Sequence, residues 1–313
     1  MTPILRPVLA VLALGWGAAG LQAPGQDKAK EITHQISVRA ITISVTVQDR
    51  SGRYVNDLAR EDFTVLENGQ KKAITYFKYD FDAPLSLAIL LDVSGSMALQ
   101  DKLADCQAAL RDLIAGLLGP RDEVSLLVFA DGQVEVAAPH AADKTRLLAE
   151  LDKVRGYGRT ALNDAVAVSP EFANRGRHEK RALLLLTDGI ENDSQTTPAQ
   201  ALAIARRVDV PIYTIGYKVP LSEKLLQEHK RKAGATAAGL IDDLREFSRA
   251  TGGKAFILDT PLQLKGALGE IRRELSHQYL LGYTSYGDPG GEYRGLTVQT
   301  SHSRYRVRTR QGY

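Results

Sequence analysis

An unbroken apolar run ends in a compact polar cluster at Leu87-Ala88-Ile89-Leu90-Leu91-Asp92-Val93-Ser94-Gly95-Ser96-Met97. The apolar part does not alternate with polar residues, which predicts a parallel strand buried on both faces. A helix-like pattern follows, so the cluster falls at the carboxyl end of a strand, where open α/β sheets bind ligands. Asp92, Ser94 and Ser96 offer only oxygen atoms, and such ligands favour hard cations such as Mg2+.

The same rhythm of strand and helix continues from residue 84 to residue 277. Apolar strands are predicted over 123–130, 181–187, 210–216 and 254–258, and amphipathic helices over 99–117, 147–154, 161–174, 198–208, 240–250 and 261–277. Alternation of this kind predicts an α/β fold in which helices cover both faces of a doubly wound, mainly parallel sheet. The insertion at 221–238 is charged and has no predicted role.

The segments on either side of this domain alternate polar and apolar residues, as β-strands do. We predict strands over 37–48, 63–67 and 73–79 before it, and 279–284, 293–300 and 304–309 after it. Asn68-Gly69 predicts a hairpin turn, and Asp57 the cap of one helical turn over 57–62. Neither segment has enough strands for a stable sandwich. We expect 37–83 and 278–313 to form one sandwich around the α/β domain, although two separate sheets would give the same pattern.

The first 20 residues have the layout of a secretory signal peptide. Arg6 is their only charge, an apolar run covers 8–17, and small residues follow at 17–20. We predict cleavage near residue 20, a linker over 21–36, and export to the periplasm or beyond; an uncleaved anchor is the alternative. No other stretch reaches the about 20 apolar residues that a membrane span needs.

Charge and cysteine content argue against a nucleic-acid-binding protein and against a protein held together by disulfides. The formal net charge of +3 is too small to indicate nucleic-acid binding. Four C-terminal arginines alternate with other residues, which predicts the solvent face of a strand rather than a polyanion site: Arg304, Arg306, Arg308 and Arg310. Cys106 is the one cysteine, so no internal disulfide forms, and its place on a helix stripe predicts an inert buried thiol.

Two more polar residues are expected at the sheet edge that carries Asp92. Thr160 follows a glycine-rich loop, and Asp188 follows the strand that ends at Thr187. Parallel strands place their carboxyl ends on one edge, so we expect these groups to converge.

Together these motifs resemble the von Willebrand factor A domain with its metal-ion-dependent adhesion site. The resemblance covers about 84–277 and has all five motif residues in order: Asp92, Ser94, Ser96, Thr160 and Asp188. The flanking segments are similar to those of an exported bacterial family with this domain at its centre; the cues are Asp57-Leu58 to Asp62-Phe63 and Tyr279-Leu280-Leu281-Gly282-Tyr283.

The resemblance implies a binding protein whose ligand is held through a metal. Ser94, Ser96 and, in some states, Thr160 would bind Mg2+, or Mn2+ or Ca2+ in its place, and Asp92 and Asp188 would hold coordinated waters. An open position would take an Asp or Glu carboxylate from a protein partner in adhesion or assembly. The alternative is a scaffolding module whose metal only stabilises the fold.

Taken one at a time, several of these residues also have a purely structural interpretation. Ser94 or Ser96 alone would more often cap the following helix. Asp164 either orients the Thr160 loop or favours the helix dipole. Residues 191–193 (Glu-Asn-Asp) are either a solvated turn or ligands.

Enzymatic classes find little support. The Gly-x-Ser-x-Gly elbow and a glycine-rich phosphate loop are absent, and the six histidines are scattered. A phosphatase that used Asp92 would need a second acid where Ser94 stands. We therefore expect no enzyme.

Overall fold

The computed structural model describes residues 37–219, 237–287 and 293–313. The predicted signal peptide, the linker over 21–36 and nearly all of the 221–238 insertion lie outside these ranges. Within them, no helix combines the length and the apolarity that crossing a membrane requires.

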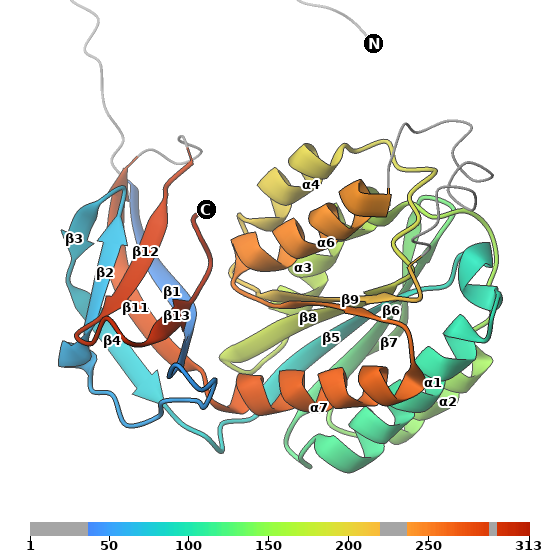
Figure 1. Cartoon of the computed structure of the whole chain (residues 1–313), viewed down its shortest axis with the longest axis horizontal. Coiled ribbons are helices and arrows are strands. Elements are labelled where there is room, and N and C mark those ends of the chain that lie inside the picture. The colour runs from blue at the N-terminus through green and yellow to red at the C-terminus, as the bar shows by residue number, and fades with distance from the viewer. Residues whose placement is uncertain (1–36, 220–236, 288–292) are drawn as a thin grey trace, which may run out of the picture. The chain divides into compact units, whose positions relative to one another are not determined.

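The centre of the fold is a six-stranded sheet in the order β10-β9-β8-β5-β6-β7 (Figure 1). Its strands are β5 (Leu85–Asp92), β6 (Glu123–Ala130), β7 (Gln133–Ala141), β8 (Lys180–Thr187), β9 (Ile212–Tyr217) and β10 (Ala255–Leu258). All pairings are parallel except that of β7 with β6. The predicted mainly parallel α/β sheet is therefore confirmed.

Helices cover both faces of this sheet, as the apolar strands require. One face packs on α1 (Lys102–Asp112), α2 (Thr145–Lys153) and α7 (Pro261–Ser276), and the other on α3 (Leu162–Asn174), α4 (Pro198–Ala205) and α6 (Ala237–Thr251). Along β5, Leu87, Ile89 and Leu91 face α1, whereas Ala88 and Leu90 face α3. Each buried leucine contributes roughly 2 kcal/mol, so the strand is fixed from both sides.

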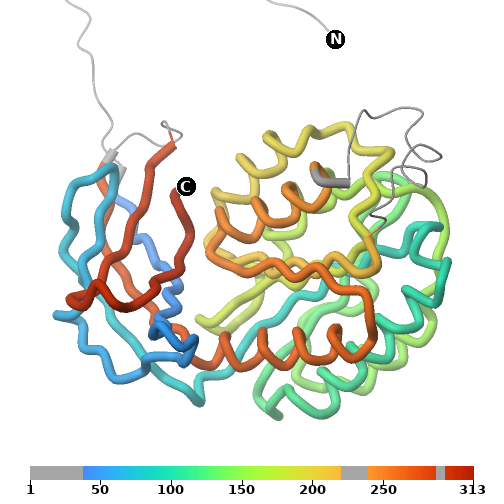
Figure 2. The backbone as a smooth tube through the Cα atoms, in the orientation of Figure 1, coloured from blue at the N-terminus to red at the C-terminus, as the bar shows by residue number. Residues whose placement is uncertain are grey.

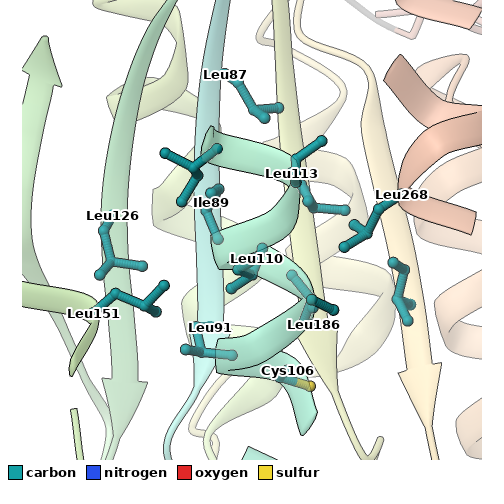
Figure 3. Packing of buried hydrophobic residues seen from close by; sticks show 14 of the residues in the cluster. Leu87, Ile89, Leu91, Cys106, Leu110, Leu113, Leu126, Leu151, Leu186 and Leu268 are labelled. Carbon is teal, nitrogen blue, oxygen red and sulfur yellow. The ribbon is translucent and has the colours of Figure 1, made fainter. Parts of the chain in front are cut away.

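Figure 3 shows how α1 rests on the strands. Cys106, Leu110 and Leu113 point from the helix onto β5 and its neighbours. The predicted burial of Cys106 is confirmed, and that burial raises the pKa of its thiol.

The prediction of one helix over 99–117 was wrong at its start. A 3-10 turn at Gly95–Ala98 comes first, and α1 begins only at Lys102, because Gln100 and Asp101 have positive φ angles. At the other end, α1 passes into a π-helical turn, Leu113–Leu117. Leu99 and Leu117 consequently lie at the surface, 57% and 45% exposed.

The flanking segments pair with each other in two small antiparallel sheets, which confirms the expectation that they belong together. One sheet, in the order β13-β1-β11-β4, combines β1 (Ser37–Gln48) and β4 (Ile74–Tyr79) with β11 (Tyr279–Gly287) and β13 (Arg306–Arg308). The other, β12-β2-β3, combines β2 (Phe63–Glu67) and β3 (Gln70–Lys72) with β12 (Leu296–Thr300). In Figure 2 the blue N-terminal strands lie beside the red C-terminal ones.

The two sheets share one hydrophobic core. Its buried members come from both sheets and both segments: Ile43, Val45, Val47, Phe63, Val65, Tyr279, Leu281, Tyr283, Leu296 and Val298. We call the two sheets together the sandwich.

Of two local predictions in the first segment, one is confirmed and one needs correction. The strand predicted over 73–79 is β4, and the chain changes sheet at Ala73, because β3 lies in the other sheet. The helical turn is a 3-10 turn, Arg60–Asp62, that begins after Ala59 rather than Asp57. The carboxylate of Asp62 accepts a hydrogen bond from the Ala59 N–H at 2.9 Å, and this bond fixes the start of the turn.

The C-terminal arginines divide into two pairs, so their prediction as one solvent face was half wrong. Arg304 and Arg306 are exposed. Arg308 pairs with the buried Glu274 of α7, and Arg310 lies 3.4 Å from Asp209. The strand end therefore turns its charges onto the α/β domain.

Candidate metal centre

The predicted site lies where the winding of the sheet reverses. The chain leaves β5 towards β6 and leaves the adjacent β8 towards β9, on the opposite side. Loops diverge at such a point and leave a crevice outside the carboxyl ends of the strands. Asp92 ends β5, and Asp188 follows β8, so both residues lie at this reversal point.

Asp92 is fully buried, and both of its carboxylate oxygens accept hydrogen bonds. Oδ1 accepts the Ser94 N–H at 2.9 Å, and Oδ2 accepts the Thr187 hydroxyl at 2.5 Å. Burial, together with the negative charge of Asp188, raises the pKa of Asp92. These bonds fix the carboxylate in one orientation behind the two serines.

Ser94 and Ser96 bring their hydroxyl oxygens to 3.1 Å from each other. Ser94 occupies the N-cap position of the 3-10 turn, yet its side chain makes no capping hydrogen bond, so the cap interpretation finds no support. Neighbouring ligands in an octahedral Mg2+ site lie about 3 Å apart, because each is about 2.1 Å from the ion. Ser94 is buried and Ser96 is half-buried, so Ser96 is the more exposed residue of the pair.

The loop before Thr160 packs closely on the serine loop. The Gly158 carbonyl accepts the Gly95 N–H at 3.0 Å. A Cβ on Gly156 would lie 2.8 Å from that of Ala98, so this approach needs glycine. Gly158 has φ +70°, and a Cβ there would meet the Asp131 carboxylate. The glycines thus bring the second predicted loop against the first.

Asn192 holds Thr160 in place. Its side-chain oxygen accepts the Thr160 N–H at 3.0 Å, and its own N–H donates to the Thr160 carbonyl at 3.1 Å. Thr160 itself is buried. Asn192 is therefore a support of the Thr160 loop, a role that sequence reasoning missed.

Two acids beside the site organise backbone. Glu191 accepts hydrogen bonds from the N–H groups of Asn163 and Ser194 at 3.1 and 2.9 Å. Asp164 accepts from the N–H groups of Gln195 and Thr196, both at 2.9 Å. Asp164 thus orients the loop after β8 rather than the Thr160 loop, and Glu191 ties that loop to α3.

Asp188 is fully buried and forms an ion pair that the sequence did not suggest. Its Oδ2 lies 2.8 Å from Nζ of Lys102, the first residue of α1, while Oδ1 accepts the Ile190 N–H at 3.2 Å. The Lys102 side chain is only 7% exposed. Gln100 and Asp101 beside it are exposed, and from the sequence a lysine at the start of a helix is expected to be solvated as well.

The donor chemistry of these residues fits a hard divalent cation. Across 37–219, 237–287 and 293–313, no group of three or more His, Cys, Asp or Glu side chains is placed to hold a metal ion. The five predicted residues instead combine two carboxylates with hydroxyl groups, and all their donors are oxygen. Oxygen donors suit Mg2+, Mn2+ or Ca2+, and a site with few carboxylates needs waters to complete it.

Comparison with known proteins gives distant relatives. A protein of Borreliella burgdorferi without an assigned function is 25% identical over 205 residues, which are 61% of this chain and 59% of that protein. The magnesium-chelatase 67 kDa subunit of Chlorobaculum parvum is 31% identical over 106 residues, which are 33% of this chain and 17% of the subunit. The chain thus spans less than two thirds of the length of these relatives.

Solved structures with a similar chain course include two bacterial proteins. BatB of Bacteroides thetaiotaomicron matches with a TM-score of 0.48 and 17% identity, over 61% of this chain and 98% of that one. The von Willebrand factor domain of the pilus tip protein Mfa5 of Porphyromonas gingivalis matches with a TM-score of 0.46 and 11% identity, over 61% and 94%.

The family comparison agrees with the motifs. Residues 87–191 match the von Willebrand factor type A domain, and this range contains all five predicted site residues. The chain therefore contains a von Willebrand factor type A domain.

Proposed function

We propose that this chain is an exported binding protein that holds an acidic side chain of a protein partner through a divalent cation. Ser94, Ser96 and Thr160 would hold the cation, and Asp92 and Asp188 would orient its waters. The observation that carries the proposal is the 3.1 Å pair of serine hydroxyls, backed by the buried Asp92 carboxylate at the switch point of the sheet. The pattern of residues 1–20 supports export.

Charge explains why such a site would bind a carboxylate. Hydroxyl ligands are neutral, and the two buried acids are partly balanced by Lys102. A cation held in this way keeps most of its positive charge. When bound, it supplies a strong electrostatic attraction for an anionic oxygen at an open coordination position.

The surroundings favour binding over catalysis. Among the described histidines, His140 contacts Ser125 and the Phe172 carbonyl, and His178 contacts the Arg121 carbonyl. No described histidine hydrogen-bonds to Ser94 or Ser96, so neither serine has the adjacent base that an activated nucleophile uses.

Water-proton relaxation with Mn2+ tests the proposal directly. Mn2+ bound to wild type should give a high relaxivity, and a peptide with one central Asp should lower it by displacing a metal-bound water. The same peptide with Asn should leave the relaxivity unchanged. Ser94→Ala should weaken Mn2+ binding by about tenfold or more, as expected for one lost ligand. Asp112→Asn, on the exposed side of α1, is the matched control.

Three results would contradict the proposal in different ways. If Mn2+ does not bind, the site is not a metal centre. If Mn2+ binds and raises the melting temperature but the Asp peptide does not lower the relaxivity, the metal only stabilises the fold. Metal-dependent hydrolysis of a phosphate ester that Asp92→Ala abolishes would indicate an enzyme.

A further inference from the structure

The Lys102–Asp188 pair stands out because both charges are almost completely removed from solvent. Nζ and Oδ2 are 2.8 Å apart, and the side chains are 7% and 0% exposed. Lysine is almost never buried without a partner, since desolvating an ammonium group costs several kcal/mol. The contact with Asp188 is therefore what allows the Lys102 ammonium group to be buried at this site.

A second buried carboxylate lies near Asp188. Asp92 is also fully buried and close enough for the two carboxylates to influence each other. Asp92 accepts hydrogen bonds from neutral groups, the Thr187 hydroxyl and the Ser94 N–H. The other nearby acid on α1, Asp105, is paired with Lys218 at 2.8 Å. Within the part of the chain that the structure describes, Lys102 is thus the cation paired with these buried acids.

We infer that Lys102 is a built-in counter-ion that balances Asp188 in the absence of metal and opposes the binding of a divalent cation, whose coordinated waters would turn to the same carboxylate. This inference rests on the proposed metal site. A fixed ammonium and a divalent cation repel each other, and both are attracted to Asp188. Lys102 would therefore keep the site folded in the absence of metal and would lower its metal affinity.

The inference differs from a purely structural ion pair in the sign of one effect. If Lys102 only positioned Asp188, its removal would loosen the carboxylate and weaken metal binding. If Lys102 competes, its removal strengthens metal binding. Even with the screening of bulk water, a unit charge roughly 6 Å from a divalent cation changes its affinity about tenfold.

Calorimetric titration of Mn2+ into wild type and Lys102→Met tests this sign. Methionine keeps the length of the lysine stem and removes the charge. We expect Lys102→Met to bind Mn2+ about tenfold more tightly, to melt at a lower temperature than wild type in EDTA, and to gain more from added Mn2+. Lys153→Met, which breaks an exposed pair with Glu150, is the matched control and should change neither quantity.

The outcomes separate the inference from the proposed function. Wild type that binds Mn2+ with Lys102→Met unchanged or weaker overturns the inference and leaves the metal site standing. Absence of Mn2+ binding in both proteins overturns both. If Lys102→Met is unfolded with and without Mn2+, Lys102→Gln, which keeps a hydrogen-bond donor for Asp188 without the charge, is titrated in its place. Tighter Mn2+ binding than wild type supports the inference, and equal or weaker binding overturns it.

Discussion

Replacing Arg308 by methionine should destabilise the protein through the buried Glu274. Glu274 lies in the last turn of α7, where the helix dipole disfavours a negative charge, and its side chain is 1% exposed. Arg308, on β13 of the sandwich, pairs with one carboxylate oxygen, and the Tyr213 hydroxyl donates to the other at 2.6 Å. The variant would leave this carboxylate buried without its counter-ion.

The size of the effect follows from these contacts. Breaking a buried ion pair by removing one partner costs about 3–5 kcal/mol. The retained bond from Tyr213 offsets about 1 kcal/mol, so the free energy of unfolding should fall by roughly 2–4 kcal/mol. For a domain of this size the melting temperature should drop by roughly 5–10 °C.

Urea unfolding followed by circular dichroism measures this change. Arg306→Met, two residues earlier and exposed, is the control and should stay within about 0.5 kcal/mol of wild type. Adding Glu274→Gln to Arg308→Met should recover much of the loss, because the unpaired charge is then gone. An Arg308→Met variant as stable as its control would refute the reasoning.

Two further predictions concern the sandwich and the Thr160 loop. Although burial opposes it, hydrogen bonds from Lys72, Ser285 and Tyr313 lower the pKa of Glu67 to about 2, against 4.5 for an ordinary glutamate. Glu67 therefore stabilises the fold above about pH 4.5, and its contribution, at most about 3 kcal/mol, is lost as the pH falls towards 2. Urea unfolding should show that the free energy of unfolding of wild type falls over this pH range, and that it falls less in Glu67→Gln. Gly158→Ala should weaken Mn2+ binding in calorimetry, because φ is +70° and the new Cβ would meet Asp131. Gly132→Ala, where φ is also +70° but the Cβ would point into open space, is the control and should bind Mn2+ as wild type does. Equal affinities in the two variants would contradict this prediction.

The sequence predicted those parts of the fold that local patterns determine. The unbroken apolar run before Asp92 predicted a buried parallel strand, and the polar residues at its end could be placed because parallel strands share an edge. The hydrophobic stripe of α1 was visible through Cys106 and Leu110. The pairing of the two flanking segments followed from their small number of strands.

The remaining features depend on contacts between residues far apart in the chain. Nothing near Lys102 indicates that its ammonium group would meet Asp188, because the partner lies on another strand's loop. Arg308 continues the alternation of Arg304 and Arg306, yet it faces an acid of α7. Leu99 fits the helical stripe, but the positive φ angles of Gln100 and Asp101 delay the helix. Such outcomes are decided by packing, which local periodicity does not encode.

Lys180 has a consequence for the order in which the chain folds. Its ammonium group donates to the carbonyl of Asp80, just before the α/β domain, and to that of Ser276, at its end. All strands of the central sheet lie between residues 85 and 258, so this sheet can form before β11 leaves the ribosome. The folded domain then holds its entry and exit together, and the long loop between β4 and β11 is already closed. Their pairing, which includes Tyr79 with Tyr279, becomes in effect a local step, and its entropic cost no longer grows with the length of the inserted domain.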